Sequence, residues 1–127
     1  MPELLQWPVL LLVEDDLLVR LTLVEALSGD GFAVLEAGDA SAALHLVCSR
    51  SEIVAMLTDL DLPGESDGFA LAQAARRVRP GLPVVYASGR CGALEPGRLV
   101  AGARFLAKPF TPSLAAETLR HLIGGRP

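Results

Sequence analysis

Residues 9–16 have the sequence VLLLVEDD, in which the apolar run Val9–Val13 leads directly into the carboxylates Glu14, Asp15 and Asp16. An apolar run without alternation predicts a strand covered on both faces, as the central strands of a parallel sheet are. Three acidic side chains therefore follow the carboxyl end of a predicted central strand. In open parallel sheets, this edge is where ligands bind.

Strand-like and helix-like segments alternate outward from this stretch to both ends of the chain. Strands are expected at Val9–Val13, Phe32–Ala37, Ile53–Leu57, Val84–Ala87 and Arg104–Ala107. Five strands alternating with helices predict an α/β fold with a parallel sheet and right-handed crossovers. No repeat, linker or low-complexity tract interrupts the pattern, so a single domain over residues 1–127 is expected.

The helical segments carry end signals and apolar stripes. Asp39 and Asp67 are placed to cap two helices, and Pro112 suits the first turn of the last one. The residues expected to face the core are Leu17, Leu21, Val24 and Leu27 in the first helix, Ala43, Leu44 and Val47 in the second, Leu71, Ala75 and Val78 in the third, and Ala115, Leu119 and Leu122 in the last.

The stretch Gly89–Gly102 departs from the alternation, because glycines recur in it together with Pro96. An internal glycine costs a helix about 1 kcal/mol and a proline about 3 kcal/mol, so a full helix is not expected there. We expect a flexible irregular segment with at most a short turn at Arg98–Ala101, able to reorder at small energetic cost.

Composition excludes several classes of protein. The net charge of −4 argues against a nucleic-acid binder, and the cluster Arg76–Arg79 is expected to be a solvated helix face. No apolar run reaches the roughly 20 residues that a membrane helix needs. Cys48 and Cys91 are too far apart for a zinc or redox motif, which favours reduced structural thiols in a cytoplasmic protein.

Lys108 is the only lysine, whereas the other ten basic residues are arginines. A compact ammonium on a flexible stem cannot be replaced by a planar guanidinium, so this position is expected to require lysine. Lys108 follows the last predicted strand and Asp59 follows the third, which brings both to the edge that carries Glu14 and Asp15. Crowded carboxylates repel one another unless a cation intervenes, and oxygen ligands suit Mg²⁺. An aspartate beside Mg²⁺ and an ammonium is a candidate nucleophile toward phosphorus.

Five motifs occur in the order found in the receiver domains of two-component response regulators. They are Val13-Glu14-Asp15-Asp16, Asp59-Leu60-Asp61-Leu62-Pro63-Gly64, Asp67-Gly68, Ser88-Gly89 and Phe105-Leu106-Ala107-Lys108-Pro109-Phe110-Thr111. Each alone is weak, but together the chain resembles this family over essentially its whole length. The resemblance implies a flavodoxin-like, doubly wound sheet of five parallel strands in the order 2-1-3-4-5, with a degraded fourth helix.

The resemblance also implies a role for each site residue. Asp59 would be the phosphoacceptor. Glu14, Asp15 and Asp59 would bind Mg²⁺, with Mn²⁺ as a substitute, and the backbone carbonyl of Asp61 would complete the protein's ligands. Lys108 would pair with the phosphoryl oxygens, and the Lys108–Pro109 peptide bond is expected to be cis. Ser88 and Phe105 would form a conformational switch.

The stretches Leu94-Glu95-Pro96-Gly97 and Phe105-Leu106-Ala107-Lys108-Pro109-Phe110-Thr111-Pro112 resemble those of receivers attached to hybrid sensor histidine kinases. The implied phosphodonor is a histidine kinase or a histidine phosphotransfer protein, and the kinase domain could belong to the same parent chain. Neither nucleic acid nor membrane is an expected partner. Phe105 lacks the phenolic hydroxyl of many receivers, and Arg90 stands where this subgroup often has an aromatic residue.

Two other functions are compatible with parts of the pattern. Asp59-Leu60-Asp61 superficially matches the nucleophile and acid/base pair of haloacid-dehalogenase-type aspartyl phosphatases. That motif usually ends the first strand, and the acidic pair it needs downstream is missing, since Glu95 and Glu117 are isolated. The chain could also be a receiver-shaped interaction module that is never phosphorylated, which the presence of Asp59, Ser88 and Lys108 argues against. The leading hypothesis is a phosphoaccepting signalling domain rather than an enzyme.

Overall fold

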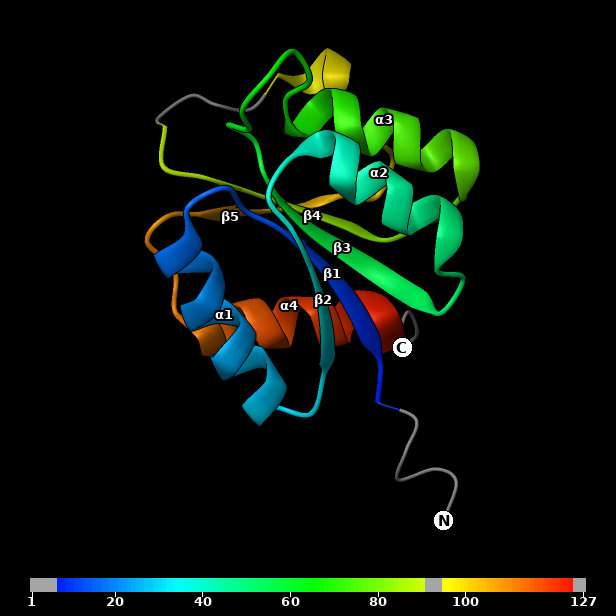
Figure 1. The fold of residues 1–127 in the computed structure, drawn as a ribbon. Coiled ribbons are helices and arrows are strands. Elements are labelled where there is room, and N and C mark those ends of the chain that lie inside the picture. Colours follow the sequence, from blue (N-terminus) through cyan, green and yellow to red (C-terminus); the bar gives the residue numbers. More distant parts are fainter. Residues whose placement is uncertain (1–6, 91–94, 125–127) are drawn as a thin grey trace.

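Five parallel strands form one sheet in the order β2-β1-β3-β4-β5 in the computed structural model, which describes residues 7–90 and 95–124 (Figure 1). The strands are β1 (Val9–Val13), β2 (Ala33–Ala37), β3 (Ile53–Asp59), β4 (Val84–Ser88) and β5 (Arg104–Ala107). The expected strand order is confirmed. Asp59 and Ser88 end their strands inside the ladder rather than following them, whereas Phe32 precedes β2.

Two helices cover each face of the sheet. Helices α2 (Ala40–Ser49) and α3 (Gly68–Val78) lie on one face, and α1 (Leu17–Gly29) and α4 (Pro112–Gly124) lie on the other (Figure 1). The predicted caps are confirmed, since the carboxylates of Asp39 and Asp67 accept from the backbone N–H groups of Ala42 and Ala70. These caps fix where α2 and α3 begin.

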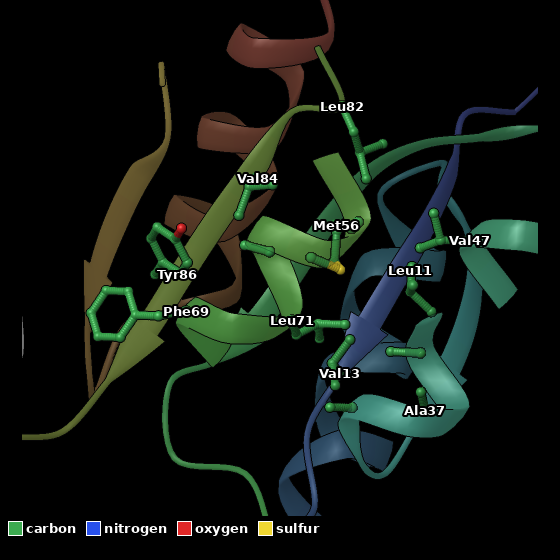
Figure 2. Close-up of a cluster of buried hydrophobic side chains, with 14 of the residues drawn as sticks. Leu11, Val13, Ala37, Val47, Met56, Phe69, Leu71, Leu82, Val84 and Tyr86 are labelled. Atoms are coloured by element: carbon green, nitrogen blue, oxygen red, sulfur yellow. The ribbon is translucent and has the colours of Figure 1, made fainter. Parts of the chain in front are cut away.

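Each face has its own apolar core, divided by the alternation of side chains along the central strands. Leu11, Val13 and Met56 pack toward α2 and α3 (Figure 2), whereas Leu10 and Leu12 pack toward α1 and α4. All five of these side chains are buried. The continuous apolar run of β1 therefore serves both faces, as predicted.

The predicted stripe of α1 is confirmed at Val24 and Leu27, which pack into the core, but it is wrong at Leu17 and Leu21. Leu17 and Leu21 are 58% and 48% exposed, and the buried positions are Leu23 and Leu27. The helix is apolar on more than one side, so its sequence does not single out the buried face. The correction leaves apolar side chains, including Leu18 at 75% exposed, on the surface of α1.

The C-terminal half of α3 also differs from expectation. Val78 is 44% exposed and does not face the core. Arg76 is half-buried, and its guanidinium donates to the carbonyl oxygens of Leu82 and Ala101 at 2.7 Å each. Arg79 is half-buried as well and donates to the carbonyl of Ile53 at 2.8 Å. These arginines join chain segments and do not form a solvated face.

The described part of the chain between β4 and β5 contains one turn of 3-10 helix, η2 (Pro96–Arg98), and no α-helix. The turn lies slightly earlier than the predicted Arg98–Ala101. The segment is tied to α3 and β4 by four side chains. Arg98 bonds Asp67 at 2.8 and 3.0 Å, Gln73 donates to the Arg98 carbonyl at 2.9 Å, Arg76 reaches Ala101, and the Tyr86 hydroxyl accepts from Val100 N–H at 3.2 Å. This anchoring holds residues 98–101, whereas the flexibility expected for Gly89–Gly97 falls partly on residues 91–94, which lie outside the described residues, and stays a prediction.

Two smaller expectations concern cysteines and membrane spans. Cys48 is a free thiol on the surface of α2 and not part of the core, whereas Cys91 lies outside the described residues. Within residues 7–90 and 95–124, no helix combines the length and apolar character needed to cross a bilayer.

Candidate functional site

Three carboxylates meet at the carboxyl edge of the sheet. Glu14 and Asp15 follow β1, Asp59 ends the adjacent β3, and one oxygen from each lies within 4.8 Å of the other two. Glu14 and Asp59 are buried, at 3% and 8% exposed, whereas Asp15 is exposed. Hard oxygen donors in this number and spacing fit a Mg²⁺ ion.

Gly68 allows α3 to begin directly against Asp59. Its N–H donates to the Leu60 carbonyl at 2.9 Å, and a Cβ added to Gly68 would stand 2.3 Å from the Asp59 carbonyl oxygen. No side chain fits at that distance from backbone atoms. The Asp67-Gly68 pair therefore has two separate roles, because Asp67 caps α3 and Gly68 lets the helix approach the strand.

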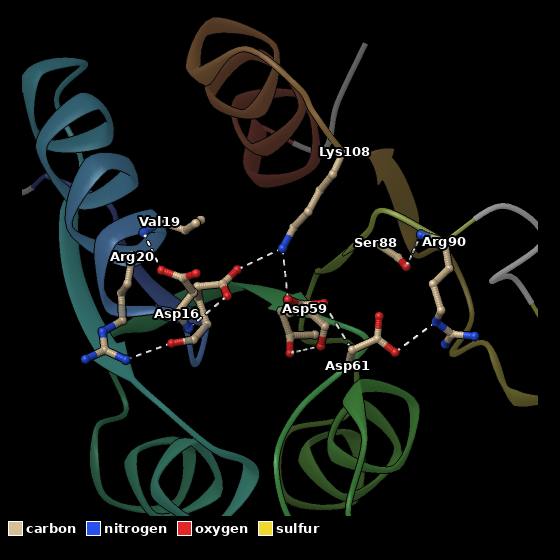
Figure 3. Close-up of polar contacts among 10 residues, drawn as sticks. Asp16, Val19, Arg20, Asp59, Asp61, Ser88, Arg90 and Lys108 are labelled. Carbon is tan, nitrogen blue, oxygen red and sulfur yellow. Dashed lines mark hydrogen bonds and ion pairs between the residues drawn. The ribbon is translucent and has the colours of Figure 1, made fainter.

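Lys108 connects two of the carboxylates. Its ammonium donates to Asp59 Oδ2 at 2.9 Å and to Glu14 Oε1 at 3.0 Å (Figure 3). Its backbone N–H donates to the Ser88 carbonyl at 2.9 Å, which fixes the end of β5 beside the end of β4. The Lys108–Pro109 bond is cis, as expected. The predicted convergence of Glu14, Asp15, Asp59 and Lys108 is therefore present in the structure.

Burial and pairing act differently on the two partners of this contact. Burial raises the pKa of Glu14, and the hydrogen bonds from Lys108 and from Asp16 N–H offset this only in part. Burial lowers the pKa of Lys108, but the hydrogen bonds to Asp59 and Glu14 outweigh it, so that pKa is raised. Lys108 pairs with two carboxylates, whereas the neighbouring charge of Asp59 raises the pKa of Glu14 further, so pairing outweighs burial only for the base. The ammonium stays protonated near neutral pH.

Ser88 lies beside Asp59 at the end of β4 and is 1% exposed. Its hydroxyl oxygen accepts from Arg90 N–H at 3.1 Å, and an oxygen that accepts one hydrogen bond can still donate its own hydrogen. The Arg90 side chain extends to Asp61, where its Nε donates to Oδ1 at 2.9 Å (Figure 3). Both side chains are more than half exposed.

Asp61 is held in two ways. Its N–H donates to Asp59 Oδ1 at 3.0 Å, and its carboxylate faces solvent and Arg90. The Asp61 backbone is therefore bonded to the Asp59 carboxylate, whereas the Asp61 side chain is not part of the cluster formed by Glu14, Asp15 and Asp59.

Phe105 lies on β5 opposite Tyr86 of β4 and packs, half-buried, against the core under α2 and α3. Tyr86 is fully buried, and its ring lies 5.3 Å from that of Phe69. Tyr86 thus supplies a phenolic hydroxyl on the strand next to Phe105, bonded to Val100.

Sequence reasoning missed two arginines at this edge. Arg20 of α1 donates to the Glu14 carbonyl at 2.7 Å, and Arg90 was noted only as a departure from the aromatic expected there. A signal for Arg20 exists, since it is the only charged residue in the first two turns of α1. Its partner Glu36, on β2, could not be identified from spacing alone.

Comparison with known proteins agrees with this geometry. Residues 10–120 match the family model of the response regulator receiver domain. The chain is 30% identical over 121 residues to the aerobic respiration control protein ArcA of Escherichia coli, covering 94% of this chain and 50% of that protein. It is 32% identical over 116 residues to the sensor kinase CckA of Brucella abortus, covering 89% of this chain and 12% of CckA. The chain thus spans half or less of these two relatives.

Solved structures show the same fold. A response regulator receiver protein from Sinorhizobium medicae superposes with a TM-score of 0.89 at 27% identity, covering 97% of this chain and 99% of that one. The receiver domain of the hybrid histidine kinase CckA superposes with a TM-score of 0.78 at 30% identity, covering 91% of this chain and 98% of that one.

Proposed function

Since the chain belongs to the response regulator receiver domain family of two-component systems, we propose that Asp59 accepts a phosphoryl group from a phosphohistidine in a Mg²⁺-dependent reaction. The observation that carries this proposal is the position of the Asp59 carboxylate. It is nearly buried, bonded to Lys108 and grouped with Glu14 and Asp15. A structural ion pair would need only one of those acids.

The residues that would hold Mg²⁺ are Glu14, Asp15 and Asp59, together with the backbone carbonyl of Asp61. A bound Mg²⁺ supplies positive charge to the phosphoryl oxygens and brings the carboxylates together without repulsion. Mn²⁺ prefers similar oxygen ligands and would substitute for it.

In the proposed transfer, a carboxylate oxygen of Asp59 forms a bond to phosphorus while the bond from phosphorus to the histidine nitrogen breaks. The bonding electron pair stays on that nitrogen, and with a proton on the other ring nitrogen the donor leaves as neutral imidazole. One phosphoryl group thus moves from the histidine to Asp59. Lys108 then pairs with a phosphoryl oxygen in place of the Asp59 carboxylate. Its raised pKa keeps it charged for that purpose.

The conformational response is proposed to begin at Ser88. Its buried hydroxyl would donate to a phosphoryl oxygen, which pulls the end of β4 toward Asp59. Phe105 packs against the apolar core under α2 and α3 and lies opposite Tyr86 of β4. A shift of β4 would therefore change the packing of Phe105. Ser88 and Phe105 thus form the proposed switch.

The proposed partner is a histidine kinase or a histidine phosphotransfer protein. A groove of about 650 Å³ runs from Lys108, Pro109 and Phe110 to Leu18 and Val19 of α1. It joins the site to Leu18 and Val19, which are exposed on α1, and an apolar helix carrying the phosphohistidine would cover them. The likeness to the receiver domain of the hybrid histidine kinase CckA suggests a kinase domain in the same parent chain as one source of this partner.

The phosphatase alternative gains nothing from the structure. It requires the Asp61 carboxylate as acid/base, whereas that side chain is half exposed and paired with Arg90. The signalling role, with no turnover beyond transfer to and loss from Asp59, remains the better supported function.

The direct test is labelling by acetyl phosphate. With Mg²⁺ present, intact-mass measurement should show one phosphoryl group on the wild type and none on Asp59→Asn. Omitting Mg²⁺ should prevent labelling, and restoring it with Mn²⁺ should allow it. Equal labelling of the two proteins would remove Asp59 from the proposed role.

A further inference from the structure

We infer that Arg20 is a positioning residue for Glu14 and thereby sets the affinity of the proposed Mg²⁺ site. The inference rests on the proposed function, because it concerns the same carboxylates. Arg20 lies on α1 and belongs to none of the motifs that identify the family.

The guanidinium of Arg20 makes two directed contacts. One terminal nitrogen donates to the Glu14 carbonyl oxygen at 2.7 Å, and Nε donates to Glu36 Oε1 at 3.1 Å. The Arg20 side chain is only 19% exposed, although it starts from the solvent side of α1. It therefore links α1, the turn after β1 and the edge strand β2.

The chain leaves space for this guanidinium at Gly38. A Cβ at that position would stand 3.0 Å from the terminal nitrogen of Arg20, closer than ordinary contacts allow. A Cβ at residue 38 would require the guanidinium to move by a few tenths of an ångström, which lengthens its short contact with the Glu14 carbonyl. The space at Gly38, the Glu14 carbonyl and the Glu36 carboxylate together form a socket for the Arg20 guanidinium.

With Arg20 in this socket, the main chain of Glu14 is held at both of its polar groups. Its N–H donates to the Ala37 carbonyl at 3.0 Å, and its carbonyl accepts from Arg20. Its carboxylate also accepts from Asp16 N–H at 3.1 Å. Loss of Arg20 would free the Glu14 carbonyl side of the turn after β1. The Glu14 carboxylate would then be held less firmly in its direction. Groups that orient metal ligands affect metal affinity even though they do not touch the ion.

The sign of the effect separates positioning from charge. Arg20 is a cation near a cation site, so removing its charge should by electrostatics alone strengthen Mg²⁺ binding. Loss of positioning should weaken it instead. The two explanations therefore predict opposite changes in Mg²⁺ affinity.

The experiment measures the Mg²⁺ concentration that gives half of the Mg²⁺-dependent rise in melting temperature. Arg20→Gln should require about tenfold more Mg²⁺ than the wild type, in line with measured effects of groups around metal ligands. Arg20→Lys, which keeps the charge but lacks the planar guanidinium that reaches two acceptors, should show a smaller loss than Arg20→Gln. Gly38→Ala keeps Arg20 intact and should raise the required Mg²⁺ about two- to threefold by displacing the guanidinium.

Arg120→Gln is the matched control. Arg120, on α4, also donates to a backbone carbonyl, that of Asp30, at 2.8 Å, and lies 3.9 Å from the Asp30 carboxylate. Its loss should lower the melting temperature without changing the Mg²⁺ midpoint. Equal or tighter Mg²⁺ binding by Arg20→Gln would overturn the inference, and an unchanged midpoint in Gly38→Ala would do so if Arg20→Gln does not fold. A wild type that gives no Mg²⁺-dependent rise would instead remove the proposed metal site.

Discussion

The two flanks of the carboxylate site are built on opposite principles. On one side, α1 exposes the apolar side chains Leu17, Leu18 and Leu21, of which Leu18 lines a groove together with Lys108. On the other side, η2 and the residues after it have little regular structure but are fixed to α3 by Arg98, Gln73 and Arg76. The presence of regular secondary structure therefore does not indicate which flank has its apolar surface buried and its polar groups paired. The helix is the flank with unburied apolar surface, and the irregular segment is the flank with its polar groups paired.

The difference assigns separate tasks to the flanks. Exposed apolar surface next to a reactive group favours docking, because covering it stabilises a complex. A segment held by paired groups resists displacement and so passes on a movement of β4 as a unit. The predictions below test each flank separately, beginning with the largest expected effect.

Leu18→Glu should disable the α1 flank alone. With a phosphorylated histidine phosphotransfer protein that labels the wild type, the transfer rate should fall about 100-fold, which corresponds to about 2.8 kcal/mol and is typical of a central interface residue. Labelling by acetyl phosphate should stay unchanged, since Leu18 is 75% exposed and makes little contribution to the fold.

The matched control for this prediction is Val78→Glu. Val78 is 44% exposed on α3, on the other face of the sheet. It should leave both kinds of labelling intact. An equal loss of transfer in both variants would mean that added negative charge, and not the α1 surface, is responsible.

Asp67→Ala should release the other flank and destabilise the fold by about 2 kcal/mol, because it removes both the cap of α3 and the partner of Arg98. Chemical denaturation measures this loss, and hydrogen exchange should rise across residues 95–103. Asp67→Asn, which still caps the helix, should lose less. An unchanged exchange rate would show that the other three contacts suffice to hold the segment.

The same pair has a pH signature. Burial raises the pKa of Asp67, but hydrogen bonds from Arg98 and Ala70 N–H outweigh it and hold the pKa below its usual value. A group whose pKa is lower in the folded state stabilises above its unfolded pKa of about 3.9 and loses this contribution as pH falls through the folded pKa. The stability advantage of the wild type over Asp67→Asn should therefore shrink below about pH 4.

Tyr86→Phe should have the smallest effect, a loss of about 1 kcal/mol. It removes only the hydroxyl that accepts from Val100 N–H, and the buried ring against Phe69 remains. Denaturation of the two proteins gives the comparison. Wild-type stability in this variant would mean that the Val100 N–H finds solvent at no cost.

The fold and the central carboxylates could be predicted because their signals are local. Asp39 and Asp67 precede their helices directly, and the acidic residues follow apolar runs that can only be buried strands. Parallel strands bring their carboxyl ends to one edge, so Glu14, Asp59 and Lys108 had to meet there.

The features that escaped prediction depend on contacts between distant positions. Arg98 and Asp67 are 31 residues apart, and Arg20 and Glu36 are 16 residues apart, with no spacing rule to join them. In the first turns of α1 the buried face escaped prediction because Leu17, Leu21 and Leu23 are equally apolar. Only packing against the sheet distinguishes them.

The single lysine of the chain has a practical consequence. An amine-directed reagent has one side chain to modify, Lys108, and that amine donates to both Asp59 and Glu14. Its raised pKa holds it as an unreactive ammonium, and its reactivity depends on which anions surround it. The rate of acylation at this position is therefore a built-in reporter, read by mass spectrometry, of whether the neighbouring carboxylates are free, bound to a cation or phosphorylated.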